Sequence, residues 1–446
     1  MGLFSKFKTF KGGVHPPEAK ELSENKAFET MPDPSQVIIP LSQHIGKPAK
    51  VNVKKAEEIK VGQVVAEQDG FISSPIHSSV AGKVFKIASN PNVGGNPKEA
   101  IIIKPAPSEE EAVTFEKLDP ETVTPDQIRE RVKEAGIVGQ GGAAFPTFVK
   151  LMPPEGKQID AVILNGCECE PYLTRDYRFM LEYPAEIISG LKLITKALGI
   201  TKGMIGIEVN KPEAIKVMEE ATKNEPDISV VPLQTKYPQG AEKMLIVACT
   251  GKEVPAGKLP LDVGAVIQNI GTAIAVHDAI VNGLPQTVAA LTVSGKGIKE
   301  PKNLFVKVGT PLQEVIDFCG GLNDEAVKVV AGGPMMGVAQ YDFSAPVTKA
   351  TSGVLALTKE EVNATVETTC LRCGKCVDHC PLGLVPTKLS RFSQLERFED
   401  AEDYNITTCM ECGTCTYCCP ANIPLVQWIR FGKSEVIKIQ RERKSS

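Results

Sequence analysis

The sequence predicts a multidomain chain of α/β and α+β class, with a barrel-sandwich-like β domain before an α/β domain and a helical, cysteine-rich domain at the end. Three observations support this fold class. With 446 residues the chain is too long to fold around one ordinary hydrophobic core, and its length suggests about three domains or more. Short β-like runs fill residues 35–105, whereas strands and helices alternate from about 125 to 285. Nine of the thirteen cysteines follow residue 369, and eight of these nine repeat one spacing twice.

Composition excludes some functions. Lys plus Arg minus Asp plus Glu is 50 − 54 = −4, and this acidic balance argues against a nucleic-acid binder. No segment approaches the roughly 20 apolar residues of a membrane span. Residues 1–13 lack the apolar stretch and cleavage site of a signal peptide. We therefore expect a cytoplasmic protein.

Both ends of the chain are basic. Residues 1–34 are expected to form an N-terminal arm. Its start interleaves Phe4, Phe7 and Phe10 with Lys6, Lys8 and Lys11. This pattern fits either an amphipathic face for a membrane surface or partner, or a disordered start. For residues 431–446 we expect a solvated basic tail in preference to a charged helix.

Residues 35–105 are punctuated by Gly and Pro and predict a small barrel or sandwich. Around residues 70–84 the segment resembles the lipoyl or biotinyl carrier fold. No lysine lies at a hairpin tip there, so we expect a structural or docking domain instead of a carrier. His44 and His77 lack ligand spacing and are expected to be structural.

Residues 106–285 predict an α/β domain. An acidic linker to about residue 125 leads to a helix start with Thr124 as the cap and Pro125 at the first helical position. A strand over 161–165 then alternates with helical patterns near 186–199 and 211–223. This alternation predicts a parallel sheet with crossover helices.

Residues 286–345 return to short strands with one helix, PLQEVIDFC, and resemble the soluble-ligand-binding β-grasp module. Cys319 ends the apolar face of that helix and is expected in the core. A connector containing TSGVLALTKEE follows. The last domain spans 360–430, and its helix-like spacer VPTKLSRFSQLERF predicts a helical domain.

The cysteines of this domain repeat one spacing, C-x2-C-x2-C-x3-C-P, twice. Structural zinc and disulfides are the alternatives. The spacing resembles bacterial two-cluster ferredoxins, in which the fourth cysteine of each motif ligates the other cluster. The resemblance implies two [4Fe–4S] clusters. One would be held by Cys370, Cys373, Cys376 and Cys419, and the other by Cys409, Cys412, Cys415 and Cys380.

A glycine-rich loop precedes the first predicted strand. Gly139, Gly141 and Gly142 allow the backbone close to a ligand, and the following AAFPTFVK could continue as a helix whose N-terminus faces it. A loop of this kind suits a phosphate, although it is not a Rossmann fingerprint. By itself it is more readily explained as a turn or a helix cap, since both are often rich in glycine.

Four motifs together resemble the NADH-binding flavoprotein subunit of respiratory complex I. They are GQGGAAFPTFVK at 139–150, NGCECEPYLTRDYR at 165–178, YPQGAE at 237–242 and IQNIGT at 267–272. The resemblance implies noncovalent FMN and NAD(H). The candidate cofactor-binding residues are Gly139, Gly141, Gly142, Phe145, Lys150, Asn165, Glu168, Glu170, Tyr237, Gly240, Glu242, Gln268, Asn269 and Thr272.

Specific roles follow from this resemblance. Backbone at 139–142 and Lys150 would hold the FMN phosphate and ring, and Asn165, Asn269 and Thr272 would bond the flavin. Phe145 would stack on the nicotinamide or adenine, Glu168 would lie near the flavin, and Glu170 and Glu242 would bond NADH hydroxyls. The chain departs from the family motifs at Gln140, Cys167 and Ala241, and Cys167 with Cys169 is expected to be a packing pair.

The order of barrel, flavin domain, β-grasp module and two-cluster domain resembles the RnfC family, the NADH-binding components of the Rnf complexes, which are membrane-bound ferredoxin:NAD oxidoreductases. The resemblance implies a peripheral subunit on the cytoplasmic face of the inner membrane. Its partners would be the other Rnf subunits, NAD(H) and, indirectly, ferredoxin, with electron transfer coupled to Na⁺ or H⁺ transport. A cobalamin reductase and a non-catalytic relay or scaffold are the alternatives.

Overall fold

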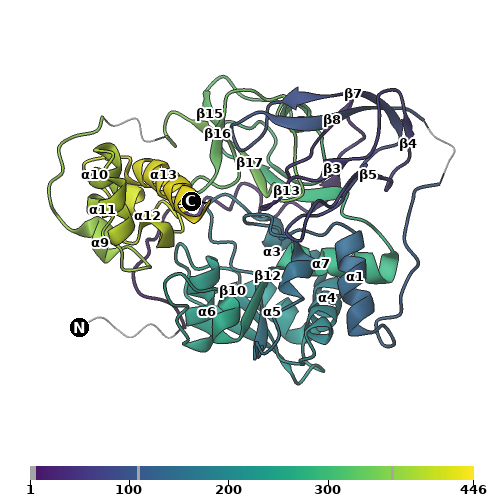
Figure 1. Cartoon of the computed structure of the whole chain (residues 1–446), viewed down its shortest axis with the longest axis horizontal. Coiled ribbons are helices and arrows are strands. Elements are labelled where there is room, and N and C mark those ends of the chain that lie inside the picture. Colours follow the sequence, from purple (N-terminus) through teal and green to yellow (C-terminus); the bar gives the residue numbers. More distant parts are fainter. Residues whose placement is uncertain (1–6, 108–110, 363–365, 446) are drawn as a thin grey trace.

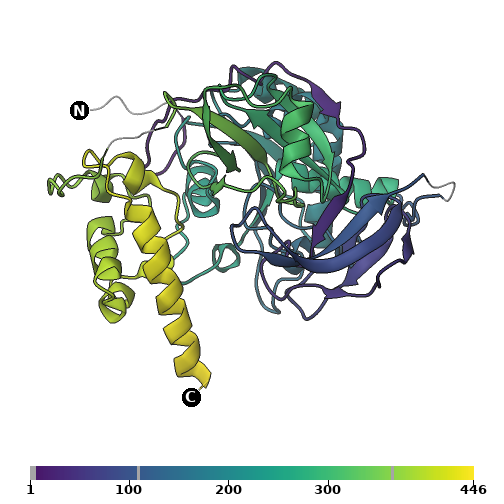
Figure 2. The same cartoon turned by 90° about the horizontal axis from the view of Figure 1, so that it is seen from above.

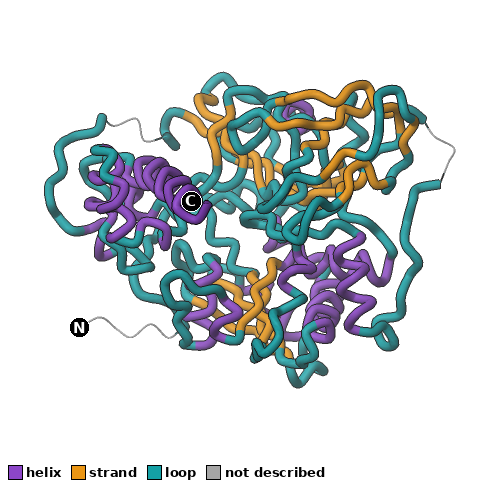
Figure 3. Tube along the Cα trace, in the orientation of Figure 1, coloured by secondary structure: helices purple, strands orange, loops and turns teal. Residues whose placement is uncertain are grey.

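A computed structural model describes residues 7–107, 111–362 and 366–445. Figure 1 shows the helical cluster domain at one end of the molecule, the α/β domain along one side and the two β-rich units along the other. The tube in Figure 3 shows that strands dominate these two units and helices dominate the cluster domain. The predicted multidomain α/β and α+β class is confirmed.

The N-terminal β domain packs two small sheets against each other. One sheet has the order β2 (Val37–Pro40), β8 (Lys98–Pro105), β7 (Gly82–Asn90) and β4 (Glu58–Ile59). The other has β3 (Lys50–Val51), β5 (Val64–Glu67) and β6 (Ile76–His77). Branched aliphatic side chains from both sheets form one core. His77 is 1% exposed and lies in this structural setting, as expected.

The α/β domain is built on a parallel sheet of order β11 (Ile228–Leu233), β10 (Gly203–Glu208), β9 (Ala161–Asn165) and β12 (Ala265–Asn269). Alternate residues of β9 enter different cores, Val162 and Leu164 on one face and Ile163 on the other. A strand buried on both faces explains the continuous apolar run in its sequence.

The helices of this domain include α1 (Pro125–Glu134), α2 (Thr147–Lys150), α3 (Arg175–Glu182), α4 (Pro184–Ala197), α5 (Pro212–Ala221), α6 (Glu242–Thr250) and α7 (Ile270–His277). A short 3-10 helix, η1 (Pro260–Val263), precedes β12, and a short π-helix, η2 (Asp278–Asn282), follows α7. Thr124 caps α1 as predicted, because its hydroxyl accepts from Gln127 N at 3.3 Å and Gln127 Oε1 accepts from Thr124 N at 2.9 Å.

The β-grasp unit has a six-stranded sheet. Its order is β1 (Phe28–Thr30), β14 (Lys302–Lys307), β13 (Val288–Ser294), β17 (Gly353–Thr358), β15 (Ala326–Ala331) and β16 (Val338–Gln340), with α8 (Leu312–Phe318) alongside. The prediction of a connector after residue 345 is wrong where β17 forms. All six residues of GVLALT are buried, because this strand lies inside the sheet.

The cluster domain is helical, as predicted. It contains α9 (Lys375–Asp378), α10 (Pro386–Gln394), α11 (Phe398–Asp403), η3 (Ile406–Thr408), α12 (Thr414–Tyr417) and α13 (Leu425–Ser445). The predicted solvated tail at 431–446 is wrong for its described part, which continues α13. Val436 of that helix is 1% exposed and belongs to the core of the domain. Figure 2 shows the end of α13 extending away from the rest of the molecule.

The described part of the N-terminal arm contacts the α/β domain, the cluster domain and the β-grasp sheet. Lys8 pairs with Leu233 and Val14 with Tyr237, and β1 then joins β14. Phe10 is 5% exposed, so it is unavailable to a membrane and residues 7–12 are not a disordered start. Phe4 and Lys6 of the predicted amphipathic pattern lie outside the described residues. In the described part of the chain no helix is long and apolar enough to cross a membrane.

Candidate functional site

The candidate flavin site lies where β9 and β12 end. Asn165 and Asn269 are register partners at the carboxyl ends of these parallel strands. Ligands of open α/β sheets bind in crevices at this edge. The two asparagines predicted as flavin ligands from separate motifs are therefore neighbours.

The glycine loop projects over this edge. Gly139 N donates to Phe145 O at 2.8 Å and closes the loop, while Gln140 N donates to Thr272 Oγ1 at 3.0 Å. Gly141 has φ +71°, and a Cβ there would stand 3.1 Å from Asn269 Nδ2. Glycine therefore suits both the conformation and the close approach.

The helix expected after this loop is only one turn long. The expected continuation through AAFPTFVK is wrong, because α2 covers Thr147–Lys150 alone. A single turn adds little to a helix dipole, so an anion would rely on the loop amides and nearby cations. One such cation is Lys150, whose Nζ lies 2.7 Å from Glu242 Oε1 and 2.9 Å from Ile267 O.

A buried polar network fixes Asn269. Its Oδ1 accepts from Gly271 N at 2.8 Å and thereby caps α7, and its Nδ2 donates to Asp176 Oδ2 at 2.7 Å. Arg175 is 2% exposed and pairs with Asp176 at 2.8 Å. Arg175 also donates to Asn269 Oδ1 at 3.3 Å. Sequence reasoning did not single out Arg175 although it lies inside the second motif, because its importance depends on this packing.

The loop after β9 carries Asn165, Glu168 and Glu170. Asn165 Nδ2 donates to Gly240 O at 2.8 Å, which joins two of the predicted motifs. Glu168, predicted near the flavin, accepts from Asp176 N at 2.7 Å and Tyr177 N at 3.1 Å. It therefore occupies the N-terminus of α3, where a carboxylate is favourable.

Glu170 faces the β-grasp unit. Its Oε2 accepts from Met335 N and its Oε1 from Met336 N, both at 3.0 Å. Burial raises the pKa of Glu170 to about 7, and these two amides partly oppose that shift. Both oxygens that were predicted to contact NADH hydroxyls therefore already accept hydrogen bonds from backbone amides.

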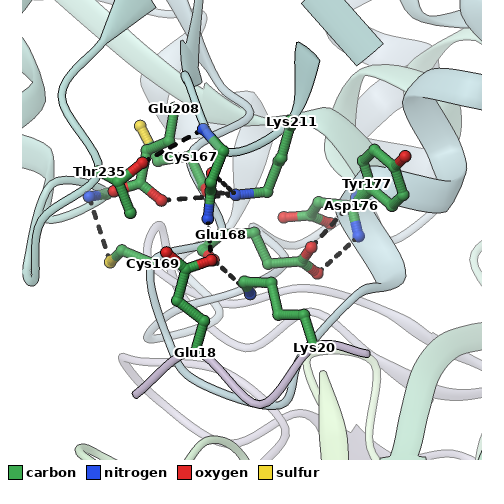
Figure 4. Close-up of polar contacts among 12 residues, drawn as sticks. Glu18, Lys20, Cys167, Glu168, Cys169, Asp176, Tyr177, Glu208, Lys211 and Thr235 are labelled. Atoms are coloured by element: carbon green, nitrogen blue, oxygen red, sulfur yellow. Dashed lines mark hydrogen bonds and ion pairs between the residues drawn. The ribbon is translucent and has the colours of Figure 1, made fainter. Parts of the chain in front are cut away.

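Two lysines bind the carbonyl groups of the same loop (Figure 4). Lys20 Nζ donates to Glu168 O at 2.9 Å, Glu170 O at 3.0 Å and Leu173 O at 2.6 Å. Lys211 Nζ donates to Cys167 O at 2.6 Å. Burial raises the pKa of the Cys167 thiol, which agrees with the expected packing role. No sequence signal pointed to Lys20, because it lies about 150 residues from its partners.

The motif cysteines form two groups. Cys380 of the first motif shares a cavity between α10 and α13 with Cys409, Cys412 and Cys415 of the second. In the other group, burial and then the charges of Cys419 and Cys370 raise the pKa of Cys376. Both groups therefore mix thiols of the two motifs.

Exposure differs between the two groups. Cys412 and Cys415 are buried, whereas Cys370 and Cys373 are exposed. Burial raises the pKa of Cys409 to about 11, so iron binding there must displace thiol protons. Within the described ranges no three His, Cys, Asp or Glu side chains are placed to hold a single metal ion.

Tyr237 joins the flavin edge to the cysteines. Its hydroxyl donates to Cys412 O at 2.7 Å, and its side chain is 2% exposed. The next residues of the same motif, around Gly240, contact Asn165. One segment thus touches both candidate sites.

The residues at the sheet edge fit a flavin. Gln268 is 3% exposed, and its Nε2 has no hydrogen-bond partner within the described part of the chain. At Gly142 no atom lies within 4 Å of the position of a Cβ. An unpaired amide donor and open loop backbone at the carboxyl edge are suited to a polar ring and a phosphate.

Family models cover most of the chain. They are the RnfC barrel sandwich hybrid domain at 8–107, the Nuo51 FMN-binding domain at 132–278, the SLBB domain at 291–339 and a 4Fe-4S dicluster domain at 369–424. The matching component of the proton-translocating ferredoxin:NAD(+) oxidoreductase complex of Clostridium ljungdahlii is 48% identical over 431 residues, which are 96% of this chain and 94% of that protein.

This chain belongs to the RnfC family. The matching component of the Na(+)-translocating ferredoxin:NAD(+) oxidoreductase complex of Acetobacterium woodii is 45% identical, covering 97% of this chain and 98% of that protein. The matches decide in favour of the RnfC family over the cobalamin reductase family. They also give this RnfC family member an FMN-binding domain and a two-cluster domain, as the sequence predicted.

The fold of this RnfC family member also occurs in a solved oxidoreductase. One polypeptide of the NAD+-reducing [NiFe]-hydrogenase aligns with a TM-score of 0.51 and 18% identity, covering 69% of this chain and 60% of that one. At this identity the likeness concerns the fold alone.

Proposed function

We propose that this chain is the peripheral NADH-binding subunit of an Rnf-type membrane complex. It passes electrons between ferredoxin-fed partners and NAD through two [4Fe–4S] clusters and FMN, and the complex couples this transfer to Na⁺ or H⁺ transport. The contact between Tyr237 and Cys412 carries the proposal, because it joins the flavin edge directly to a cluster motif. The names of the relatives as components of ferredoxin:NAD(+) oxidoreductase complexes support it.

The proposed reaction needs a cofactor that links two-electron transfer with nicotinamide to one-electron transfer through the clusters. FMN, when bound, exchanges two electrons with nicotinamide and single electrons with iron–sulfur clusters. The loop at 139–142 would hold its phosphate, and Asn165, Gln268 and Asn269 would bond its ring. The pair of Lys150 and Glu242, 2.7 Å apart, would orient the nucleotide with one positive and one negative group.

The positions of the thiols support an order for the two clusters. The cluster ligated by Cys380, Cys409, Cys412 and Cys415 would be proximal to the flavin, because Tyr237 contacts Cys412. The cluster ligated by Cys370, Cys373, Cys376 and Cys419 would be distal. The exposure of Cys370 and Cys373 suits exchange of electrons with another subunit on the cytoplasmic face.

The test uses the full chain, reconstituted anaerobically with FMN, iron and sulfide. It should retain flavin that acid releases, and NADH should reduce an artificial acceptor in its presence. Lys150→Met should lower flavin retention or raise the KM for NADH, whereas Lys192→Met, at a surface pair with Glu225, should change neither. A folded, reconstituted chain without bound FMN would refute the proposal and favour a non-catalytic relay.

Association with the complex needs a separate test. Extraction of membranes from the source cells in mild detergent should co-purify membrane subunits with this chain. Recovery of the active chain without any membrane subunit would contradict the peripheral location.

A further inference from the structure

We propose that Glu170 is a positioning residue that holds the proximal cluster motif against the flavin domain through residues 333–336 of the β-grasp unit. This inference rests on the proposed function and deepens it. It gives Glu170 a task different from the nucleotide contact expected from the sequence.

The Glu170 carboxylate accepts hydrogen bonds from two successive backbone amides. Its two oxygens accept from Met335 N and Met336 N at 3.0 Å each. A Cβ on Gly333 would collide with Glu170 Oε2, so the close approach requires glycine there. Above about pH 7 the Glu170 carboxylate is ionised. Hydrogen bonds to an ionised acceptor are among the stronger ones, and two of them fix the loop in one orientation.

The loop at residues 333–336 in turn contacts the second cysteine motif. Met335 O lies 2.9 Å from the position of a Cβ on Gly413, which directly follows Cys412. Met335 also packs in one apolar cluster with Tyr237 and Cys412. The cluster motif is therefore held from the flavin side by Tyr237 and from the β-grasp side by Met335.

The backbone of Glu170 is fixed as well. Lys20 Nζ donates to Glu170 O at 3.0 Å and to Leu173 O at 2.6 Å. Glu170 thus links the N-terminal arm, the flavin domain and the β-grasp loop. By contrast, Glu242 pairs with a lysine side chain on the flavin domain itself.

The test compares Glu170→Gln with Glu242→Gln in the reconstituted full chain. In Glu170→Gln one of the two accepting carboxylate oxygens is replaced by an NH2 group, which can only donate. One backbone amide of the loop then loses its acceptor, so hydrogen exchange of the Met335 and Met336 amides should accelerate roughly tenfold. The EPR signal of the proximal cluster should shift, while the KM for NADH stays within about twofold. Glu242→Gln should change the KM and leave both the exchange and the EPR signal unaltered.

Gly333→Ala provides a second route if Glu170→Gln folds poorly. It should weaken the same two hydrogen bonds by displacing the loop, without altering the carboxylate. It should therefore produce the same changes in hydrogen exchange and in the EPR signal. A raised KM for NADH in Glu170→Gln, with unchanged exchange and EPR signal, would overturn the inference. A wild-type chain without flavin or clusters would refute the proposed function instead. Hydrogen exchange would still test whether Glu170 holds the Met335 and Met336 amides.

Discussion

Substitution of Cys380 tests how the two motifs share their clusters. Cys380 belongs to the first motif by sequence but lies in one cavity with Cys409, Cys412 and Cys415. Cys380→Ala should therefore damage the proximal cluster. Each [4Fe–4S] cluster holds half of the iron, so the variant should lose about half of the bound iron.

Double variants remove the need to assign the spectrum. If Cys380 and Cys412 serve one cluster, Cys380→Ala with Cys412→Ala should lose no more iron than either single variant, about half. Cys380→Ala with Cys373→Ala should lose nearly all of it. Iron and acid-labile sulfide are measured after anaerobic reconstitution, with EPR of the reduced sample as the second readout.

Cys418→Ala is the matched control. Its thiol donates to Cys415 O at 3.5 Å and has no place in the ligand spacing, so iron content should stay at the wild-type level. The reverse pattern would refute the reasoning: nearly complete loss with Cys380 and Cys412 together, and half loss with Cys380 and Cys373. That result would mean that each motif ligates its own cluster.

Three further predictions concern contacts between domains. Lys20→Met should lower the free energy of unfolding by about 3 kcal/mol, measured in urea with flavin release as the probe, because it leaves three carbonyls without their donor; unchanged stability would contradict this. Tyr237→Phe should cost about 1–3 kcal/mol, since the buried carbonyl of Cys412 loses its partner, and should loosen protease protection of residues 409–418 with flavin content retained. Lys349 Nζ donates to Pro75 O of the N-terminal β domain at 3.0 Å and to Gly136 O of the α/β domain at 2.6 Å. Burial lowers the pKa of Lys349 to about 7, so the unfolded chain binds more protons between about pH 7 and 10.5, and the free energy of unfolding should rise with pH there. Lys349→Met should flatten this rise in urea titrations. An equally steep rise in the variant would assign it to other groups such as Lys20, whose pKa is also lowered by burial.

Local sequence signals predicted much of the fold. The cap at Thr124 and the apolar run at 161–165 depend on near neighbours, and both occur where expected. The tandem cysteine spacing likewise identified the two-cluster domain. These features can be predicted from the sequence because one short segment contains both partners of the interaction.

Features that depend on distant partners were missed. β1 and β17 complete a sheet whose other strands lie elsewhere in the chain, and the end of α13 is ordered by packing that includes Val436. Motif resemblance identified Glu170 as a site residue but could not show that Met335 and Met336 occupy its oxygens. Lys20 carried no signal at all, because only the folded arm brings it to the loop.

The most direct test of the account is anaerobic titration of the reconstituted chain with NADH, followed by optical and EPR spectroscopy. The account predicts that NADH bleaches the flavin and reduces the clusters, and that chain loaded with clusters but stripped of FMN shows no cluster reduction. Cluster reduction by NADH without FMN would contradict it.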